Sequence, residues 1–233
     1  MGLVGLQLRW NLIIVVTNLR ELLNVDNRVK CLANGAYNYE NFFVQFNEKA
    51  LELGPKLRQP RIEDLRGCSM FKYAPLDYIH GLTPYVKKVI GHAPIVGNHK
   101  YVLVDVKISK VQKGRWSCLR GWHCDVTMNP VRPERPEKHH LFVSGHNCLT
   151  EFVKHPSLIQ FDDKIRYPNK SWIDDQLEGC SVIEVPSCQY VTYGRRTLHR
   201  GPKAKEDEIR LLVRITETDI ILPIKKTIGK FYD

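Results

Sequence analysis

The chain has 233 residues, of which 43% are hydrophobic and 26% charged, a balance that excludes disorder along its whole length. Its 35 lysines and arginines against 25 aspartates and glutamates give a net charge of +10. That charge is typical either of a protein with a polyanionic partner, nucleic acid first among them, or of a basic surface that simply faces solvent.

The cysteines indicate a reducing environment. There are seven, an odd number, and no two form a C-x-x-C pair. This pattern argues against a zinc ribbon and against a secreted disulfide scaffold. We therefore expect reduced thiols and a cytoplasmic location.

The N-terminal stretch MGLVGLQLRWNLIIVV is apolar only in places. Its longest uninterrupted apolar run, Leu12 to Val16, is too short to span a membrane, and its flanks do not fit a signal peptide. Leu6 stands where N-myristoylation needs Ser or Thr. We expect a buried strand or helix here and no membrane partner.

The next stretch, YNYENFFVQFNEKALELGP, predicts a helix. Its apolar residues recur three and four positions apart, at Phe42, Phe43, Phe46, Ala50 and Leu53. Asn38 is a suitable N-cap, and Gly54 followed by Pro55 would end the helix. Residues 55–99 are rich in Pro and Gly, which predicts loops and short elements.

From Lys100 onward the pattern changes to β. The stretches YVLVDVKISKV, HLFVSG, SVIEVPSCQYVTYG and EIRLLVRIT are rich in β-branched residues and separated by turn-like segments. They predict a mainly β, mostly antiparallel core over residues 100–233. A helical and loop-rich part, residues 1–99, would pack on this core to give one compact domain.

The stretch WHCDV contains a candidate metal-binding pair. In a strand, His123 and Asp125 point to one face and Cys124 to the other, so that the imidazole and the carboxylate could chelate one ion. His199 lies 74 residues beyond Asp125, near the end of another β stretch. His139, His140, His146 and His155 lie between them and could supply a ligand instead, although we expect the pair His139-His140 to be solvated.

Two arginines share one face of the predicted strand EIRLLVRIT. Arg210, Leu212, Arg214 and Thr216 alternate with the apolar residues of the opposite face. Such arginines either face solvent or point into a cavity, where a guanidinium binds a carboxylate through two parallel hydrogen bonds.

Together, His123, Asp125, His199 and Arg210, the last eleven residues after His199, closely resemble the pattern of the Fe(II)/2-oxoglutarate-dependent dioxygenases. The resemblance covers about residues 100–216. It implies a double-stranded β-helix, the jelly-roll or cupin-like fold. It also implies that His123, Asp125 and His199 bind Fe(II) and are catalytic, and that Arg210 binds the far carboxylate of 2-oxoglutarate.

The resemblance further implies the reaction. 2-Oxoglutarate binds the iron through its keto oxygen and C1 carboxylate, and O2 takes the third open position. Decarboxylation to succinate and CO2 then leaves a ferryl oxidant that removes a hydrogen atom from the substrate, which is hydroxylated or oxidatively demethylated. Arg214 would hold an anionic substrate group, or replace Arg210 as the 2-oxoglutarate ligand.

Basic residues flank the predicted ligands, so we expect an anionic substrate. Five lie between Asp105 and Asp125, with Trp116 and Trp122 among them, and a second group of four surrounds His199. Phosphate contacts combined with aromatic stacking are typical of nucleic-acid binding. We therefore list Arg120 and Trp122, besides Arg214, as candidate substrate-binding residues.

Nucleic acid, a nucleotide, a small metabolite and a peptide all remain candidate substrates. Two other readings of the chain stay open: a non-catalytic jelly-roll module that binds nucleic acid, and a hydrolase on a cupin-like barrel. A zinc site that uses Cys118 and Cys124 has no support from spacing, because these residues match no closed finger pattern.

Overall fold

The computed structural model describes residues 42–46, 51–125, 137–161, 170–219 and 225–232. The chain divides into two compact units. The larger comprises residues 45–128, 135–159 and 168–233 and contains the two larger sheets. The smaller comprises residues 1–44, 129–134 and 160–167, nearly all outside the described ranges, as is the apolar N-terminal stretch.

The larger unit is built around a seven-stranded antiparallel sheet with the strand order β12-β3-β4-β11-β5-β9-β2. Its two long central strands pair along their whole length, from Glu208 opposite Val111 to Thr218 opposite Tyr101. The strands are β2 (Glu52–Lys56), β3 (Ser69–Pro75), β4 (Tyr101–Val111), β5 (Lys138–Val143), β9 (Gln189–Gly194), β11 (Glu208–Thr218) and β12 (Lys225–Lys230).

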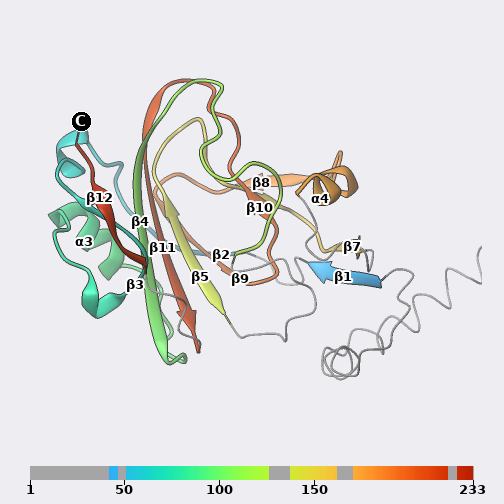
Figure 1. Ribbon diagram of the computed structural model, residues 1–233, viewed down its shortest axis with the longest axis horizontal. Helices are drawn as coiled ribbons and strands as arrows, with labels where there is room; N and C mark the ends of the chain where they lie inside the picture. The colour runs from blue at the N-terminus through green and yellow to red at the C-terminus, as the bar shows by residue number, and fades with distance from the viewer. Residues whose placement is uncertain (1–41, 47–50, 126–136, 162–169, 220–224, 233) are drawn as a thin grey trace, which may run out of the picture. The chain divides into compact units, whose positions relative to one another are not determined.

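A second, three-stranded sheet has the order β10-β6-β8, with β6 (Glu151–Val153), β8 (Val182–Glu184) and β10 (His199–Arg200). β1 (Phe42–Phe46) and β7 (Ser157–Phe161) form a separate two-stranded pair. In Figure 1, α3 lies on one side of the large sheet and β8 and β10 lie on the other.

Helices are few among the described residues. α3 (Pro84–Gly91) begins after Thr83, whose side chain accepts a hydrogen bond from the Val86 backbone N–H. α4 (Lys170–Gln176) precedes β8, and two short 3₁₀ turns flank β3, η1 (Ile62–Asp64) and η2 (Leu76–Tyr78). No helix in the described ranges is long and apolar enough to cross a membrane.

Side chains of β11 alternate between two faces, one that packs in the hydrophobic core and one that carries the candidate site residues. Leu211, Val213 and Ile215 are fully buried on one face, where they pack with β3, β4 and α3. The other face carries the two arginines and Leu212, and Leu212 packs with a second apolar cluster. That cluster comprises Leu141, Val143, Leu149, Phe152, Val185, Val191 and Tyr193, from both sheets and the segments beside them. The mainly β, antiparallel character predicted for residues 100–233 is confirmed.

The helix predicted over residues 37–55 is wrong where the structure describes it. Residues 42–46 form β1, and residues 52–56 form β2 at the edge of the large sheet. The three phenylalanines that suggested a helical face also fit a short aromatic strand. Pairing with another strand decides between the helical and the strand conformation. Leu53, expected in the core, is 65% exposed, and Pro55 is tolerated because an edge strand needs no donor on its outer side.

The large sheet continues across residue 99, the expected boundary between the N-terminal part and the core. β3 pairs with β4, and β2 pairs with β9. Residues 52–75 therefore add strands to the same sheet.

Candidate metal centre

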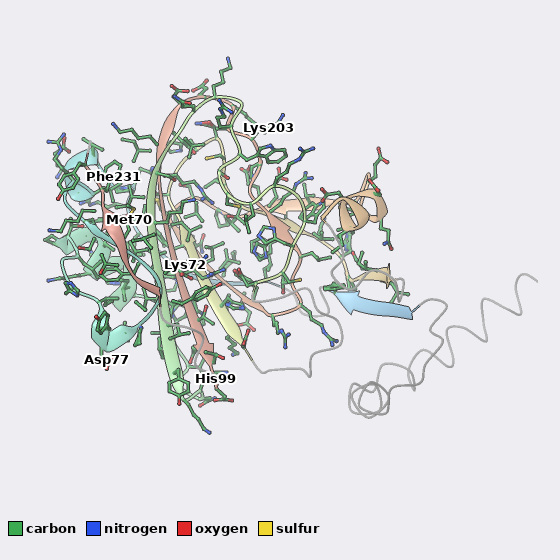
Figure 2. All side chains as sticks on the ribbon, viewed as in Figure 1. Met70, Lys72, Asp77, His99, Lys203 and Phe231 are labelled. Carbon is green, nitrogen blue, oxygen red and sulfur yellow. The ribbon has the colours of Figure 1, made fainter. Side chains whose placement is uncertain are left out.

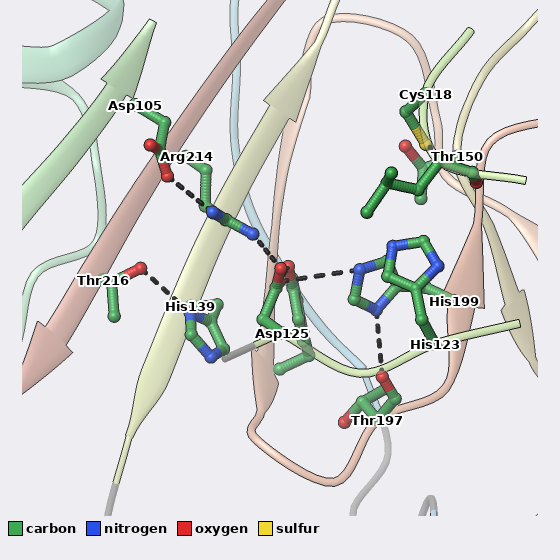
Figure 3. A network of polar contacts seen from close by, with 12 residues as sticks. Asp105, Cys118, His123, Asp125, His139, Thr150, Thr197, His199, Arg214 and Thr216 are labelled. Atoms are coloured by element: carbon green, nitrogen blue, oxygen red, sulfur yellow. Dashed lines mark hydrogen bonds and ion pairs between the residues drawn. The ribbon is translucent and has the colours of Figure 1, made fainter. Parts of the chain in front are cut away.

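His123 and His199 face each other across a two-residue antiparallel bridge. Each backbone N–H donates to the carbonyl of the other residue, at 3.0 and 2.9 Å. Directly opposed residues of an antiparallel pair point to the same side, so both imidazoles project together, with ring centroids 4.6 Å apart (Figure 3). Both side chains are buried. The pairing thus joins two histidines that lie 76 positions apart in the sequence.

Backbone carbonyls fix the proton position on both rings. Nδ1 of His123 lies 2.9 Å from the carbonyl oxygen of Gly121, and Nδ1 of His199 lies 2.9 Å from that of Thr197. A carbonyl oxygen only accepts, so Nδ1 carries the hydrogen in each ring and Nε2 of a neutral ring keeps its lone pair. Burial lowers the pKa of His199 to about 4, which keeps this ring neutral at physiological pH. This is the tautomer that metal-binding histidines adopt.

The Asp125 carboxylate is directed toward the same point. Its Oδ2 lies 3.6 Å from Nε2 of His199 and accepts a hydrogen bond from the Tyr193 hydroxyl at 2.5 Å, and its Oδ1 pairs with Arg214. A neutral His199 places no hydrogen between Nε2 and Oδ2, so two lone pairs face each other. A cation between them would turn this repulsion into attraction.

Two neutral imidazoles and one carboxylate match the donor set of non-haem Fe(II) centres. Adjacent octahedral ligands at about 2.1 Å from an ion lie about 3 Å apart. The 3.6 Å separation of His199 and Asp125 is therefore slightly open. Among the described residues, no group of three or more His, Cys, Asp or Glu side chains is arranged closely enough to hold a metal ion.

Arg214 links Asp125 to a second buried carboxylate. Its Nε and Nη2 donate to Oδ2 of Asp105, at 2.9 and 2.7 Å, while Nη1 reaches Asp125. Asp105 also accepts from the backbone N–H of Tyr73 at 2.8 Å. Burial disfavours the charged guanidinium, but Asp105 and Tyr73 outweigh it and raise the pKa of Arg214. Arg214 is thus a permanent cation that orients Asp125, and two carboxylates already engage the donors that were expected to bind substrate.

Arg210, in contrast, has no carboxylate partner among the described residues. Its side chain is 1% exposed, its Nη2 donates to Thr150 Oγ1 at 3.0 Å, and its Nε has no hydrogen-bond partner there. Burial lowers its pKa. Glu208 raises this pKa only through a longer-range charge interaction and forms no ion pair with Arg210. A buried guanidinium without a directly paired carboxylate is unfavourable, so this position suits a bound anion. Figure 3 shows Thr150, the partner of Arg210, beside the His199 ring.

The other candidate substrate-binding residues differ in exposure. Trp122 is 2% exposed and lies under the Arg200 guanidinium, 4.4 Å from the ring centroid, so its face is not open to a stacking base. Arg120 is exposed and lies beside Trp116. Cys124 is buried, with a thiol pKa that burial raises.

The expectation that the pair His139-His140 is solvated is wrong, because both side chains are fully buried. His139 Nδ1 contacts Thr216 Oγ1 at 3.0 Å, and its ring centroid lies 5.1 Å from that of Tyr193, beside the candidate metal centre. Burial lowers the pKa of His139 to about 3. His140 bonds Thr192 and Glu217 instead. His146 and His155 are exposed.

Two residues of this site, Tyr193 and Asp105, were not among those expected from the sequence, and His139 was named there only as an alternative ligand. Tyr193 and Asp105 both lie in stretches that read as strands, and only the alternation of those strands gave a signal for their orientation. A scan against models of protein families and a search of curated proteins returned no match.

Proposed function

We propose that the chain is an Fe(II)- and 2-oxoglutarate-dependent dioxygenase that hydroxylates or oxidatively demethylates an anionic substrate. The observation that carries the proposal is the arrangement of His123 and His199, whose Nδ1 atoms are fixed by carbonyls, opposite the Asp125 carboxylate. When bound, Fe(II) and 2-oxoglutarate would couple decarboxylation of the cosubstrate, with release of succinate and CO2, to oxidation of the substrate by O2.

The strand connections support a jelly-roll, the double-stranded β-helix, as the fold. From β4 onward the chain goes to the bridge at His123, then to β5, and then to β6 and β8. It returns through β9 and β10 to β11. Apart from β7, which pairs with β1, these steps alternate between the large and the small sheet, as a jelly-roll would require.

The residues of the chain have distinct roles in this proposal. His123, Asp125 and His199 would hold the iron, and Tyr193 and Arg214 would orient the carboxylate. Arg210 would bind the far carboxylate of 2-oxoglutarate, because it is a buried cation that forms no ion pair in the described ranges and has a free Nε donor there. The apolar cluster around Phe152 would exclude water from the reacting centre. The six described cysteines are free thiols, which supports a reducing compartment such as the cytoplasm.

Anaerobic addition of Fe(II) and then 2-oxoglutarate tests the proposal. We expect a visible charge-transfer absorption, followed by succinate formation when air is admitted. Both signals should disappear in His199→Ala and persist in the control His146→Ala, which changes an exposed histidine. Absence of both signals in the folded wild-type protein overturns the proposal, and hydrolysis that needs no 2-oxoglutarate would point to a hydrolase instead.

A further inference from the structure

The two segments that carry the site histidines remain paired beyond them. Ser117 N–H donates to the Pro202 carbonyl at 3.2 Å, Ala204 N–H donates to that of Arg115 at 2.9 Å, and Trp116 lies opposite Lys203. We call residues 114–123 and 199–204 the arm. Lys203 is four residues from His199, at most about 13 Å along an extended chain. Figure 2 shows Lys203 at the opposite end of the large sheet from His99.

Close packing at Gly201 holds the arm together. A Cβ at this position would lie 2.4 Å from Sγ of Cys118 and 2.5 Å from Oγ of Ser117, so only glycine fits. Seven positions separate Trp116 from His123, whereas four separate Lys203 from His199. The longer segment therefore bulges outward between the two bridges, and Leu119 and Arg120 are exposed there.

Trp116 is the exposed aromatic residue of this arm. It is 37% exposed, the Arg120 guanidinium lies 5.9 Å from its ring centroid, and the Lys203 ammonium lies 5.4 Å from it. Both cations are exposed and stand at the ends of long side chains, so they can leave the ring when another flat group stacks there. Trp122, which sits under Arg200, does not offer such a face.

The exposed cations of the arm are not paired with nearby carboxylates. Arg115, Arg120 and Lys203 are exposed and form no ion pair with a described residue. Three of the four neighbouring acids have other partners: Glu151 pairs with Arg200, Asp207 accepts from the Lys113 backbone, and Glu208 accepts from residues 146–148. The fourth, Glu206, is exposed and forms no ion pair with a described cation of the arm. A polyanion would thus meet two available cations, Arg120 and Lys203, beside one aromatic ring, with Arg115 next to it in the sequence.

We propose that the arm binds single-stranded nucleic acid, with a base stacked on Trp116 and phosphates on Arg120 and Lys203. A ring flanked by cations suits a base flanked by phosphates, whereas an acidic peptide would use the cations and leave the ring without a partner. The arm leads to the His123–His199 pair, so we infer that the bound nucleic acid is the substrate. This inference rests on the proposed oxygenase function. Binding of the nucleic acid to the arm itself needs neither iron nor 2-oxoglutarate.

Fluorescence anisotropy with a labelled single-stranded oligonucleotide, in the presence of a metal chelator, tests this binding. Trp116→Ala should weaken binding about tenfold, and Trp116→Phe should retain most of it. Arg120→Gln and Lys203→Gln should each lower the slope of log K against log salt by about 0.7. The controls are Lys87→Gln on α3 and Tyr232→Ala, two exposed side chains outside the arm.

Two results would overturn the proposal that the arm binds nucleic acid. One is oligonucleotide binding that is unchanged in Trp116→Ala, and the other is a polyglutamate peptide that binds as tightly as the oligonucleotide. If the oligonucleotide binds through Trp116 but Fe(II) and 2-oxoglutarate give no charge-transfer absorption, the proposal of nucleic-acid binding by the arm holds and the oxygenase proposal fails. The reverse result leaves the oxygenase and removes nucleic acid as its substrate.

Discussion

Nε2 of His199 and Oδ2 of Asp125 lie 3.6 Å apart with no proton between them, because Nδ1 of His199 carries the ring hydrogen and donates it to the Thr197 carbonyl. Two electron-rich atoms held together inside a protein are unfavourable unless a cation joins them. The backbone pairing of His123 with His199 and the Arg214 contact with Asp125 hold this geometry. We therefore expect that binding of a divalent cation stabilises the fold.

The first prediction concerns metal-dependent stability. Mn(II), which avoids oxidation, should raise the Tm of the protein, and a metal concentration of 100 times Kd should add about 2.7 kcal/mol to the free energy of unfolding. His199→Ala should remove the increase, and His146→Ala should keep it. An equal increase in wild type and His199→Ala would place the bound metal elsewhere.

The second prediction concerns pH. The folded-state pKa values of His199, about 4, and His139, about 3, lie below the ordinary value of 6.5. Between the folded-state pKa values and 6.5, the unfolded chain binds protons that the folded chain does not. The contribution of these rings to the free energy of unfolding is therefore fully present above about pH 6.5 and is lost as pH falls from there to the folded-state values. His199 alone accounts for about 3 kcal/mol. Urea unfolding from pH 7 to pH 4 measures this loss, and His139→Gln should make the decrease smaller. A flat profile in the wild type would contradict the burial of neutral rings.

Local alternation predicted much of the sheet and of the site. In β11 it separates Leu211, Val213 and Ile215 from the arginines, and in WHCDV it places His123 and Asp125 together and Cys124 apart. These predictions succeed because a strand has one period, and that period can be read within a few residues. The assignment of His123, Asp125 and His199 as iron ligands stays a prediction, although the three side chains lie together.

The contacts that the sequence did not reveal are all long-range. Asp105 pairs with Arg214 because β4 and β11 are in a register that no local pattern encodes, and Tyr193 reaches Asp125 from β9. His139 was expected in solvent, yet β5 lies between β11 and β9 and buries it. The helix predicted from the aromatic run at residues 42–46 was wrong for the same reason, since the partner strand of this segment, β7, is more than 100 residues away.

The third prediction concerns the residues that orient Asp125. Tyr193→Phe removes the hydroxyl that donates to Asp125 and should weaken metal binding 10- to 100-fold. The matched control is Tyr190→Phe, on the opposite face of β9, whose hydroxyl donates to the Val89 carbonyl. Isothermal titration with Mn(II) measures both. Equal affinities in the two variants would show that the Tyr193 hydroxyl has no effect on the metal.

Removal of the Arg214 charge should have a different effect. Arg214→Met leaves Asp105 and Asp125 buried without their cation and should destabilise the fold by about 3–5 kcal/mol, measured by urea unfolding. Asp105→Asn in the same background should restore part of this loss, because it removes one of the unpaired charges. A double variant no more stable than Arg214→Met would mean that Asp105 is not the charge that Arg214 neutralises.

The last prediction separates stability from ligand binding at Arg210. Because this buried guanidinium has no carboxylate partner in the described part of the chain, Arg210→Met should leave the free energy of unfolding unchanged or raise it. The same variant should lose the increase in Tm that 2-oxoglutarate gives the Mn(II)-loaded wild type, since the far carboxylate loses its fork of donors. Differential scanning fluorimetry measures both values, and succinate, which has one carboxylate at each end but no keto group, serves as a weaker ligand for comparison. A variant that is several kcal/mol less stable, or that keeps the full response to 2-oxoglutarate, would exclude Arg210 as the carboxylate anchor.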